Sequence, residues 1–315
     1  MSAEFDLRDV PQDYLADPYA CLARLRAVAP VHPSPDGTFV LTAYDDIVQT
    51  YRDPAIWSSD KTRAFWPKFG DSPLFEHHTT SVVFVDPPDH TRIRKLFQSA
   101  FTRKALAAFV PRISDLVDGY LDQLEAAGTM EVVEDFSFRL PIEVVSDLLG
   151  VPRSDRDLIR RWAVAILTAL EPSVSQAQLD EGNQSVVDFK AYLRALIAFR
   201  RAHPDGAADT EVLTVLADAE ADGERLSEGE LLHQCIFMLN AGHETSTNMI
   251  SHGIHEMLRH PDQIRRLTQD PSLIDPMVEE VLRYQAPIQI NNRVATTDQI
   301  LSGVRIPAGA TVHMM

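Results

Sequence analysis

The sequence predicts a mainly α-helical fold with small β-sheets. Helix caps and apolar residues at helical spacing recur from about residue 103 onward, with little of the alternation that strands show. Short strand patterns occur near both ends, at residues 37–42 and after residue 286. The chain has 315 residues, of which 45% are hydrophobic and 24% charged. A chain of this length and composition can build one large core or two modest ones without disulfides or metals. We expect a single domain spanning residues 1–315.

Charge and cysteine content restrict the compartment and the partners. The formal net charge is −17, which repels phosphate backbones and anionic lipid. Cys21 and Cys235 are far apart and have no metal-ligand spacing, which fits a reducing compartment. The first residues contain no apolar leader, and the longest apolar run, near residues 163–167, is far shorter than the ~18 residues of a membrane helix. We expect a cytoplasmic protein that binds neither nucleic acid nor membrane.

The predicted domain has four consecutive parts. Residues 1–60 form a mixed α/β part, with a helix at 17–29, a strand at 37–42 and a helix at 44–52. Residues 61–89 combine prolines and glycines with aromatic residues and predict a long loop, either functional or an ordinary surface excursion. Residues 90–286 form the helical part, and residues 287–315 form short β segments.

Helical spacing and caps place seven helices in the third part. These are expected at 104–126, 140–149, 155–170, 176–201, 210–221, 227–259 and 276–284. The helix at 227–259 begins with a capping box, because Glu230 follows Ser227 by three positions. At 1.5 Å per residue it spans about 45–50 Å, enough to cross a small domain.

The middle of this long helix contains an unfavourable turn. Its sequence is Ala241-Gly242-His243-Glu244-Thr245. Glycine costs about 1 kcal/mol relative to alanine in a helix, and hydroxyl side chains compete for backbone carbonyls, so we expect the turn to be loosened. The small residues would let a flat ligand or a diatomic molecule approach the backbone, and an acid beside an alcohol can deliver protons. A polar break in a solvated helix explains the same pattern equally well.

A zinc site at this turn is a weaker interpretation. His243-Glu244 begins like a metalloprotease helix, but Thr247 replaces the required second histidine. An unrelated helical metalloenzyme would have to use His243, Glu244 and His252 instead. The sequence therefore predicts no metal ligand set.

Two further patterns are weak when taken alone. Glu280 and Arg283 lie one helical turn apart and can form a surface ion pair. His90 and Arg94 lie four residues apart on one helix face, which suits an anionic ligand such as a carboxylate. An ordinary basic helix is the alternative for the second pattern.

Taken in order along the chain, these motifs resemble the soluble bacterial cytochrome P450 family. Residues 241–246 match its oxygen-activation motif, 280–283 match its Glu-x-x-Arg motif, and 86–94 resemble the segment that holds a haem propionate. Residues 292–295 and 306–309 resemble the strands that follow. The resemblance implies a haem-thiolate monooxygenase containing haem b (iron protoporphyrin IX), which hydroxylates or epoxidises a lipophilic small molecule with O2.

The resemblance also implies residue roles. Glu244 and Thr245 would be catalytic and organise water and protons, and Glu280 with Arg283 would form a structural ion pair. The cofactor-binding residues would be His90, Arg94, Ala241, Gly242 and Arg293. The substrate-contacting residues would be Phe237, Asn240, Ile288 and Ile290. Residues 61–89 would form the substrate-access loop.

The resemblance implies a redox partner as well. A ferredoxin or flavodoxin would dock near Lys95, Arg103 and Lys104, in a segment with basic residues and no acid. A solvated helix face is the alternative. We expect the protein itself to be a monomer.

One family motif is missing from the 315 residues. The haem-ligand loop, Phe-x-x-Gly followed by the thiolate cysteine, lies after the Pro-Ala-Gly strand in the family, whereas this sequence ends at Met315. Thiolate ligation promotes O–O cleavage. We therefore expect a C-terminally truncated chain that is inactive by itself. The alternative is a haem-free, non-catalytic protein of the same fold that binds small molecules.

Overall fold

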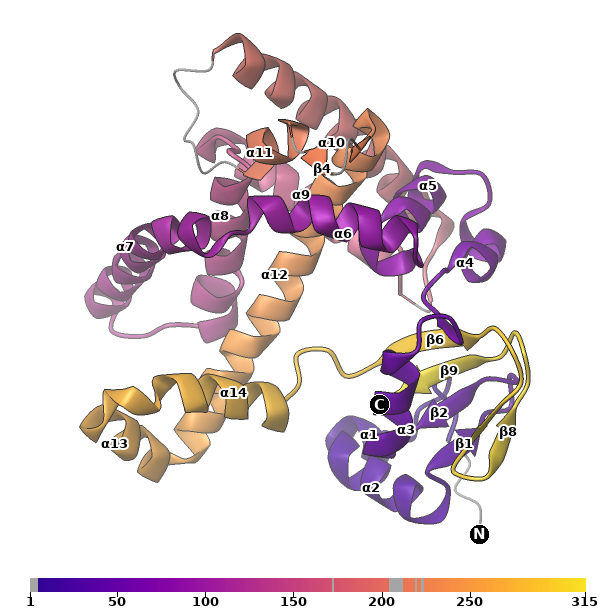
Figure 1. Cartoon of the computed structure of the whole chain (residues 1–315). Coiled ribbons are helices and arrows are strands. Elements are labelled where there is room, and N and C mark those ends of the chain that lie inside the picture. Colours follow the sequence, from indigo (N-terminus) through magenta and orange to yellow (C-terminus); the bar gives the residue numbers. More distant parts are fainter. Residues whose placement is uncertain (1–4, 172, 204–211, 219, 222–223) are drawn as a thin grey trace. The chain divides into compact units, whose positions relative to one another are not determined.

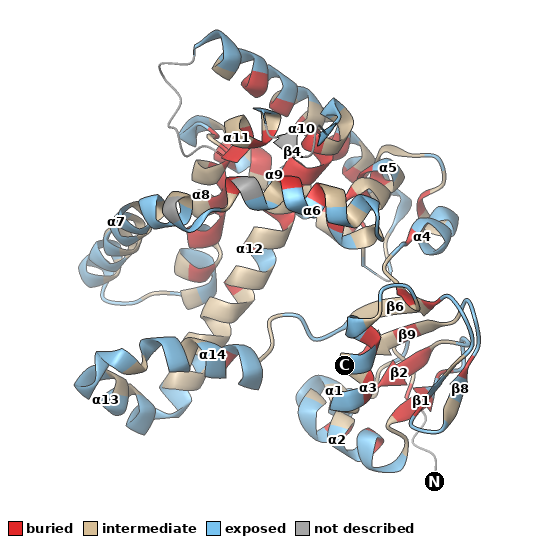
Figure 2. Ribbon diagram, in the orientation of Figure 1, coloured by how far each residue is buried: buried red, intermediate tan, exposed pale blue. Residues whose placement is uncertain are grey.

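The computed structural model describes residues 5–171, 173–203, 212–218, 220–221 and 224–315, without the side chains of residues 99, 104, 220 and 221. These residues form two compact units, each with its own core (Figures 1 and 2). Unit 1 contains residues 1–70, 83–91 and 288–315, and unit 2 contains residues 71–82 and 92–287. We predicted one domain of consecutive parts, whereas unit 1 combines segments from both ends of the chain.

Unit 1 is built on a five-stranded sheet with strand order β1-β2-β9-β6-β3. Its strands are β1 (Val31–Pro33), β2 (Phe39–Leu41), β3 (Trp57–Ser58), β6 (Asn291–Ala295) and β9 (Thr311–Met314), and β7 (Gln299–Leu301) pairs with β8 (Val304–Ile306). Its helices are α1 (Gln12–Ala16), α2 (Pro18–Val28), α3 (Tyr44–Arg52) and α4 (Thr62–Phe69). The parallel pairing of β2 with β9 joins the two ends of the chain. Apolar side chains on one face, including Leu41, Trp57 and Val312, form the core.

Unit 2 is helical and is organised around one long helix. Its helices are α5 (Pro73–Thr80), α6 (Asp89–Ala100, which begins in unit 1), α7 (Arg103–Ala127), a π-helix (Val132–Ser137), α8 (Arg139–Leu148), α9 (Arg156–Thr168), α10 (Gln176–Ala202), α11 (Val212–Asp218), α12 (Glu228–Arg259), α13 (Pro261–Gln269) and α14 (Ile274–Tyr284). Two-residue strands β4 (Glu220–Ala221) and β5 (Glu224–Arg225) precede α12. The long helix α12 packs against α5, α8, α9 and α10. Figure 2 shows its N-terminal half as mostly buried.

The capping box predicted at the start of α12 is present. Ser227 Oγ accepts from the Glu230 amide at 3.2 Å, and the Glu230 carboxylate accepts from the Ser227 amide at 2.8 Å. Six of the seven predicted helices match the observed ones to within about two residues at each end. The seventh, predicted at 210–221, extends over residues outside the described ones; its described part includes α11.

The prediction of a long loop at 61–89 was wrong. This segment contains α4, α5 and a 3₁₀ turn at Val82–Phe84. Pro73 occupies the first turn of α5, where a proline costs no hydrogen bond. Ser72 caps the same helix, its Oγ accepting from the Phe75 amide at 3.2 Å. The prolines that suggested a loop partly mark a helix start, and Pro261 does the same for α13, which the sequence analysis missed.

Candidate active site

The turn from Ala241 to Thr245 lies near the middle of α12, in unit 2. The helix remains α-helical through this turn, so the expected loosening does not interrupt it. The hydroxyls do bond one turn back: Thr245 Oγ1 donates to the Ala241 carbonyl at 2.7 Å, and Thr247 Oγ1 donates to the His243 carbonyl at 2.9 Å. Glu244 is exposed within this unit and Thr245 is half-buried. The acid and the hydroxyl are thus adjacent, and both are accessible from solvent.

Helix packing explains why a glycine, with no side chain, stands at position 242. A Cβ at this position would lie 2.8 Å from Cγ2 of Val145 on α8, which is closer than real Cβ contacts allow. Next to it, His243 is buried, and its Nε2 lies 3.2 Å from the Phe138 carbonyl oxygen. Burial lowers the pKa of His243. The side of Gly242 from which a side chain would project therefore faces α8.

The two predicted substrate residues on α12 differ in their surroundings. Phe237 is half-buried, whereas Asn240 is 5% exposed. The amide oxygen of Asn240 is buried and accepts no hydrogen bond from any described residue. An unsatisfied buried carbonyl costs roughly 1–3 kcal/mol, so a ligand that donates to it would be favoured.

No histidine pair on α12 forms a metal site. His252 Nδ1 lies 3.3 Å from the Gln285 carbonyl oxygen, and His243 contacts a different carbonyl. Within the described part of the chain, no group of three or more His, Cys, Asp or Glu side chains could hold a metal ion.

His90 and Arg94 both lie on α6, but in different units. His90 is half-buried in unit 1, and Arg94 is exposed in unit 2. Among the described residues, the His90 ring has no hydrogen-bond partner and the Arg94 guanidinium has no acidic one. Both side chains therefore remain available to an anion.

Arg293 lies on β6 in unit 1 beside a second cation, Lys61. Arg293 Nη1 donates to the Asn292 carbonyl at 2.9 Å, and its guanidinium lies over the Tyr51 ring at 5.2 Å. Lys61 Nζ donates to the same carbonyl at 3.4 Å and is 5% exposed. Burial is the main cause that lowers the pKa of Lys61 to about 8, and the positive charge of Arg293 adds to it. The negative charges of Asp86 and Asp60 act in the opposite direction. The sequence did not predict a role for Lys61, because a single lysine does not form a recognisable motif.

The predicted Glu280 and Arg283 pair is present on α14. Arg283 Nε and Nη2 each lie 2.7 Å from a Glu280 carboxylate oxygen, and both side chains are largely exposed in unit 2. Glu280 also lines a groove of about 490 Å³ between α12, α13 and α14, in the same unit. The apolar residues in the groove lining are Met257, Leu267, Leu273, Pro276, Met277, Val281 and Tyr284.

Ile288 and Ile290 lie between α14 and β6 in unit 1 and are 58% and 40% exposed.

The two cysteines, Cys21 and Cys235, are both buried. Burial raises the pKa of Cys235 to about 12, so this thiol stays protonated. None of the helices in the described part of the chain is long and apolar enough to cross a membrane.

Comparison with known proteins identifies the family of this chain. The cytochrome P450 family model matches residues 163–315. The vitamin D(3) 25-hydroxylase of Pseudonocardia autotrophica is 36% identical over 302 residues, which cover 95% of this chain and 72% of that protein. The cytochrome P450 monooxygenase PikC of Streptomyces venezuelae is 36% identical over 315 residues, covering 98% and 72%.

Solved structures give the same result. CalO2 matches with a TM-score of 0.90 and 29% identity, over 100% of this chain and 77% of that one. P450BioI, solved in complex with an acyl carrier protein, matches with a TM-score of 0.86 and 31% identity, over 96% and 77%. Fold and sequence together define a monooxygenase that uses haem. The chain belongs to the cytochrome P450 family.

The family's cofactor is haem, and its enzymes act on small molecules with electrons from redox partners. The chemistry of three basic side chains suits that group, each considered within its own unit. His90, Arg94 and Arg293 have no carboxylate partner among the described residues, and haem carries two carboxylates that such groups bind well.

Proposed function

We propose that this P450 hydroxylates or epoxidises a lipophilic small molecule, as a monomer that receives electrons from a ferredoxin or flavodoxin. The adjacency of Glu244 and Thr245 on α12 carries the proposal. When bound, haem supplies the iron that activates dioxygen. Glu244 is exposed in its unit and can exchange protons with water, while the Thr245 hydroxyl donates to the Ala241 carbonyl and keeps its lone pairs free to accept. The pair would pass protons from solvent toward the reacting oxygen.

Cofactor binding would rest on cationic and small residues. His90, Arg94 and Arg293 would neutralise the haem carboxylates through charge-assisted hydrogen bonds. Ala241 would leave space beside α12 for the oxygen pocket, whereas the position of a side chain at Gly242 is filled by Val145 of α8. We assign Glu280 and Arg283 no chemistry, since they already satisfy each other.

Substrate contacts would come mainly from α12. The unsatisfied amide oxygen of Asn240 would accept from a substrate hydroxyl, and Phe237 would supply an apolar surface one turn earlier. The exposed side chains of Ile288 and Ile290 would add apolar contacts. Residues 61–89 would form the substrate-access segment, with two short helices in place of a loop.

The redox partner would dock on basic residues of α6 and α7. Lys95 and Arg103 are exposed within unit 2, whereas the Lys104 side chain lies outside the described residues. In the haem-loaded protein, Lys95→Glu and Arg103→Glu should slow partner-dependent reduction and weaken its dependence on salt. An unchanged rate and an unchanged salt dependence would contradict this docking surface.

Both cysteines of this sequence are buried, so we propose that neither Cys21 nor Cys235 supplies a thiolate to haem. The test is the absorbance spectrum of purified protein with added haem, reduced under carbon monoxide, beside the His90→Ala and Arg94→Ala variants. We expect a weak complex without a thiolate-type Soret band, weakened further in both variants. A thiolate-type band would contradict this proposal. Lipophilic ligand binding without any haem uptake would favour the haem-free alternative.

A further inference from the structure

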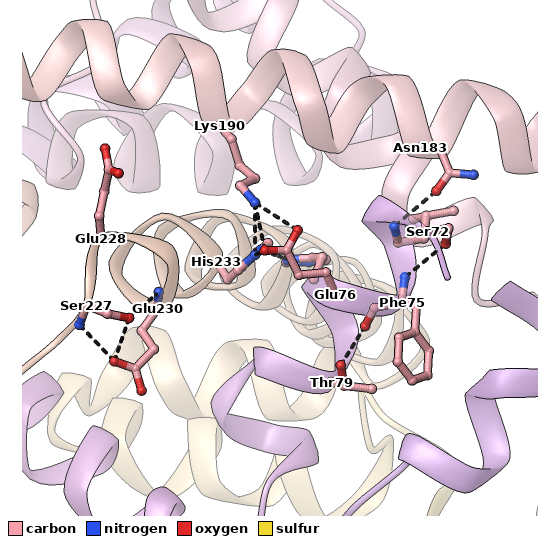
Figure 3. Close-up of polar contacts among 12 residues, drawn as sticks. Ser72, Phe75, Glu76, Thr79, Asn183, Lys190, Ser227, Glu228, Glu230 and His233 are labelled. Atoms are coloured by element: carbon pink, nitrogen blue, oxygen red, sulfur yellow. Dashed lines mark hydrogen bonds and ion pairs between the residues drawn. The ribbon is translucent and has the colours of Figure 1, made fainter. Parts of the chain in front are cut away.

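Three helices of unit 2 meet in an ionisable cluster whose histidine is buried and whose carboxylate is about half exposed. Glu76 of α5, Lys190 of α10 and His233 of α12 contact one another (Figure 3). Lys190 Nζ lies 3.0 and 2.9 Å from the two Glu76 carboxylate oxygens and 3.3 Å from His233 Nε2. His233 Nε2 also lies 3.1 Å from Glu76 Oε1. The cluster therefore ties the middle of α5 to both long helices.

A second imidazole extends the cluster inward. His77 Nδ1 lies 3.4 Å from His233 Nδ1, and each of the two histidines is only 1% exposed. Full burial, followed by the charges of His78, His233 and Lys190, holds the pKa of His77 well below 6.5. Burial also lowers the pKa of His233, against the raising effect of Glu76, and the charges of Lys190 and Arg194 add to the lowering. Both rings are thus neutral at neutral pH.

The geometry sets a limit on the number of protons. With neutral rings, one proton lies between the two Nδ1 atoms, so that one ring donates and the other accepts. If both rings are doubly protonated, two N–H groups face each other across 3.4 Å, beside the Lys190 ammonium. Glu76 supplies one negative charge against these three positive charges. Protonation of both rings therefore makes the cluster repulsive.

Two other anchors of α5 are amide side chains that do not titrate. At its start, the Leu74 amide donates to Asn183 Oδ1 at 3.0 Å. After its end, Gln234 accepts from the Val82 amide at 2.9 Å and donates to the Thr80 carbonyl at 2.7 Å. An eight-residue helix is unstable alone, so α5 persists only through such contacts. Loss of the central anchor alone should loosen α5 while its ends stay attached.

We propose that Glu76, Lys190, His233 and His77 form a proton-sensitive latch that holds α5 on α10 and α12 at neutral pH and loosens it under acidic conditions. Proton linkage determines in which direction pH shifts the equilibrium between the docked and the loosened state. In the loosened state the two imidazoles recover a pKa near the ordinary 6.5 and bind more protons than in the docked state. Lowering the pH below about 6.5 therefore favours the loosened state. The proposal depends only on contacts inside unit 2 and not on the proposed monooxygenase activity.

Hydrogen exchange measured by mass spectrometry tests the latch on the full chain. Exchange of a peptide covering α5 is compared between pH 7.5 and pH 5.5 after correction for intrinsic rates, with a peptide covering α9 as reference. We expect the protection of α5 to fall at least tenfold while α9 changes less than twofold. His233→Gln keeps an amide able to bond Glu76 or Lys190 but cannot gain a proton, so its α5 response should shrink below threefold.

His243→Gln is the matched control, because His243 is another buried histidine of α12 that has no contact with the cluster. This variant should keep the tenfold response. The latch is wrong if α5 and α9 lose protection together, or if His233→Gln responds like the unmodified chain. If His233→Gln fails to fold, His77→Asn decides by the same threefold criterion, since asparagine keeps a hydrogen-bonding group near the Nδ1 position.

Discussion

Gly242 on α12 and Val145 on α8 are in such close contact that a Cβ on Gly242 would lie 2.8 Å from Cγ2 of Val145. The glycine that sequence analysis related to a ligand therefore also lets two helices pack closely. Gly253, about three turns further along the same helix, is different: a Cβ there would lie 3.5 Å from the nearest atom of Val281, an ordinary contact.

Gly242→Ala should destabilise the chain by about 1–3 kcal/mol, because overpacking outweighs the gain in helix propensity. The free energy of unfolding by urea, followed by far-UV circular dichroism, measures the change. Gly253→Ala is the control and should be neutral or up to about 1 kcal/mol stabilising. Val145→Ala should relieve the effect in the double variant. Equal effects of the two glycine substitutions would contradict the packing explanation.

Asp147→Asn should lower the free energy of unfolding by about 2 kcal/mol. Asp147 accepts from Arg112 Nε at 2.7 Å and also pairs with Arg156, whose side chain is 9% exposed. Removing the shared carboxylate charge leaves a buried guanidinium with Glu143 as its remaining acidic partner. Asp157→Asn is the control: its carboxylate is 90% exposed and pairs with Arg160 at 3.4 Å, so urea unfolding should be unchanged.

Lys61→Met should stabilise the chain at pH 7, and the gain should shrink as the pH rises through the range from 8 to 10.5. The pKa of Lys61 is about 8 in the folded chain and 10.5 in the unfolded one, so the unfolded chain binds more protons between these values. At about 1.4 kcal/mol per pKa unit, the gain at pH 7 is limited to about 3 kcal/mol. Thermal unfolding at pH 7 and pH 10 measures it. A loss of stability at pH 7 would show that the ammonium has a stabilising role.

Glu280→Gln should leave the urea midpoint of the chain unchanged. Glu280 and Arg283 form a close pair, but their side chains are 59% and 68% exposed, and water screens such pairs strongly. Val281→Ala, which removes methyl groups from the buried neighbour on α14, should lower the midpoint and shows that the assay detects changes in this helix. A lower midpoint for Glu280→Gln would mean that the pair stabilises α14 despite its exposure.

Local signals predicted much of the helical part. Two examples are the capping box of Ser227 with Glu230 and the ion pair of Glu280 with Arg283. Both contacts lie within one helical turn, so the residue spacing in the sequence is enough to predict them. The same local signals failed at residues 61–89, because a proline such as Pro73 is compatible with a turn and with the first turn of a helix.

Among the candidate site residues, too, local motifs revealed some and only tertiary contacts revealed others. His90, Arg94, Glu244 and Thr245 were found from motifs and lie on the helices expected for them. Lys61 was not found, because its proximity to Arg293 joins positions more than 200 residues apart in the chain. The contacts of Glu76, Lys190 and His233 were missed for the same reason.

The sequence by itself determined the family and the long helix, since motifs and caps are properties of short stretches of chain. The tertiary structure alone decided which of these residues touch: Gly242 against Val145, Lys61 beside Arg293, and His77 against His233. The physical reason is that burial and the charges of distant segments set space and pKa, and both depend on how helices and strands pack.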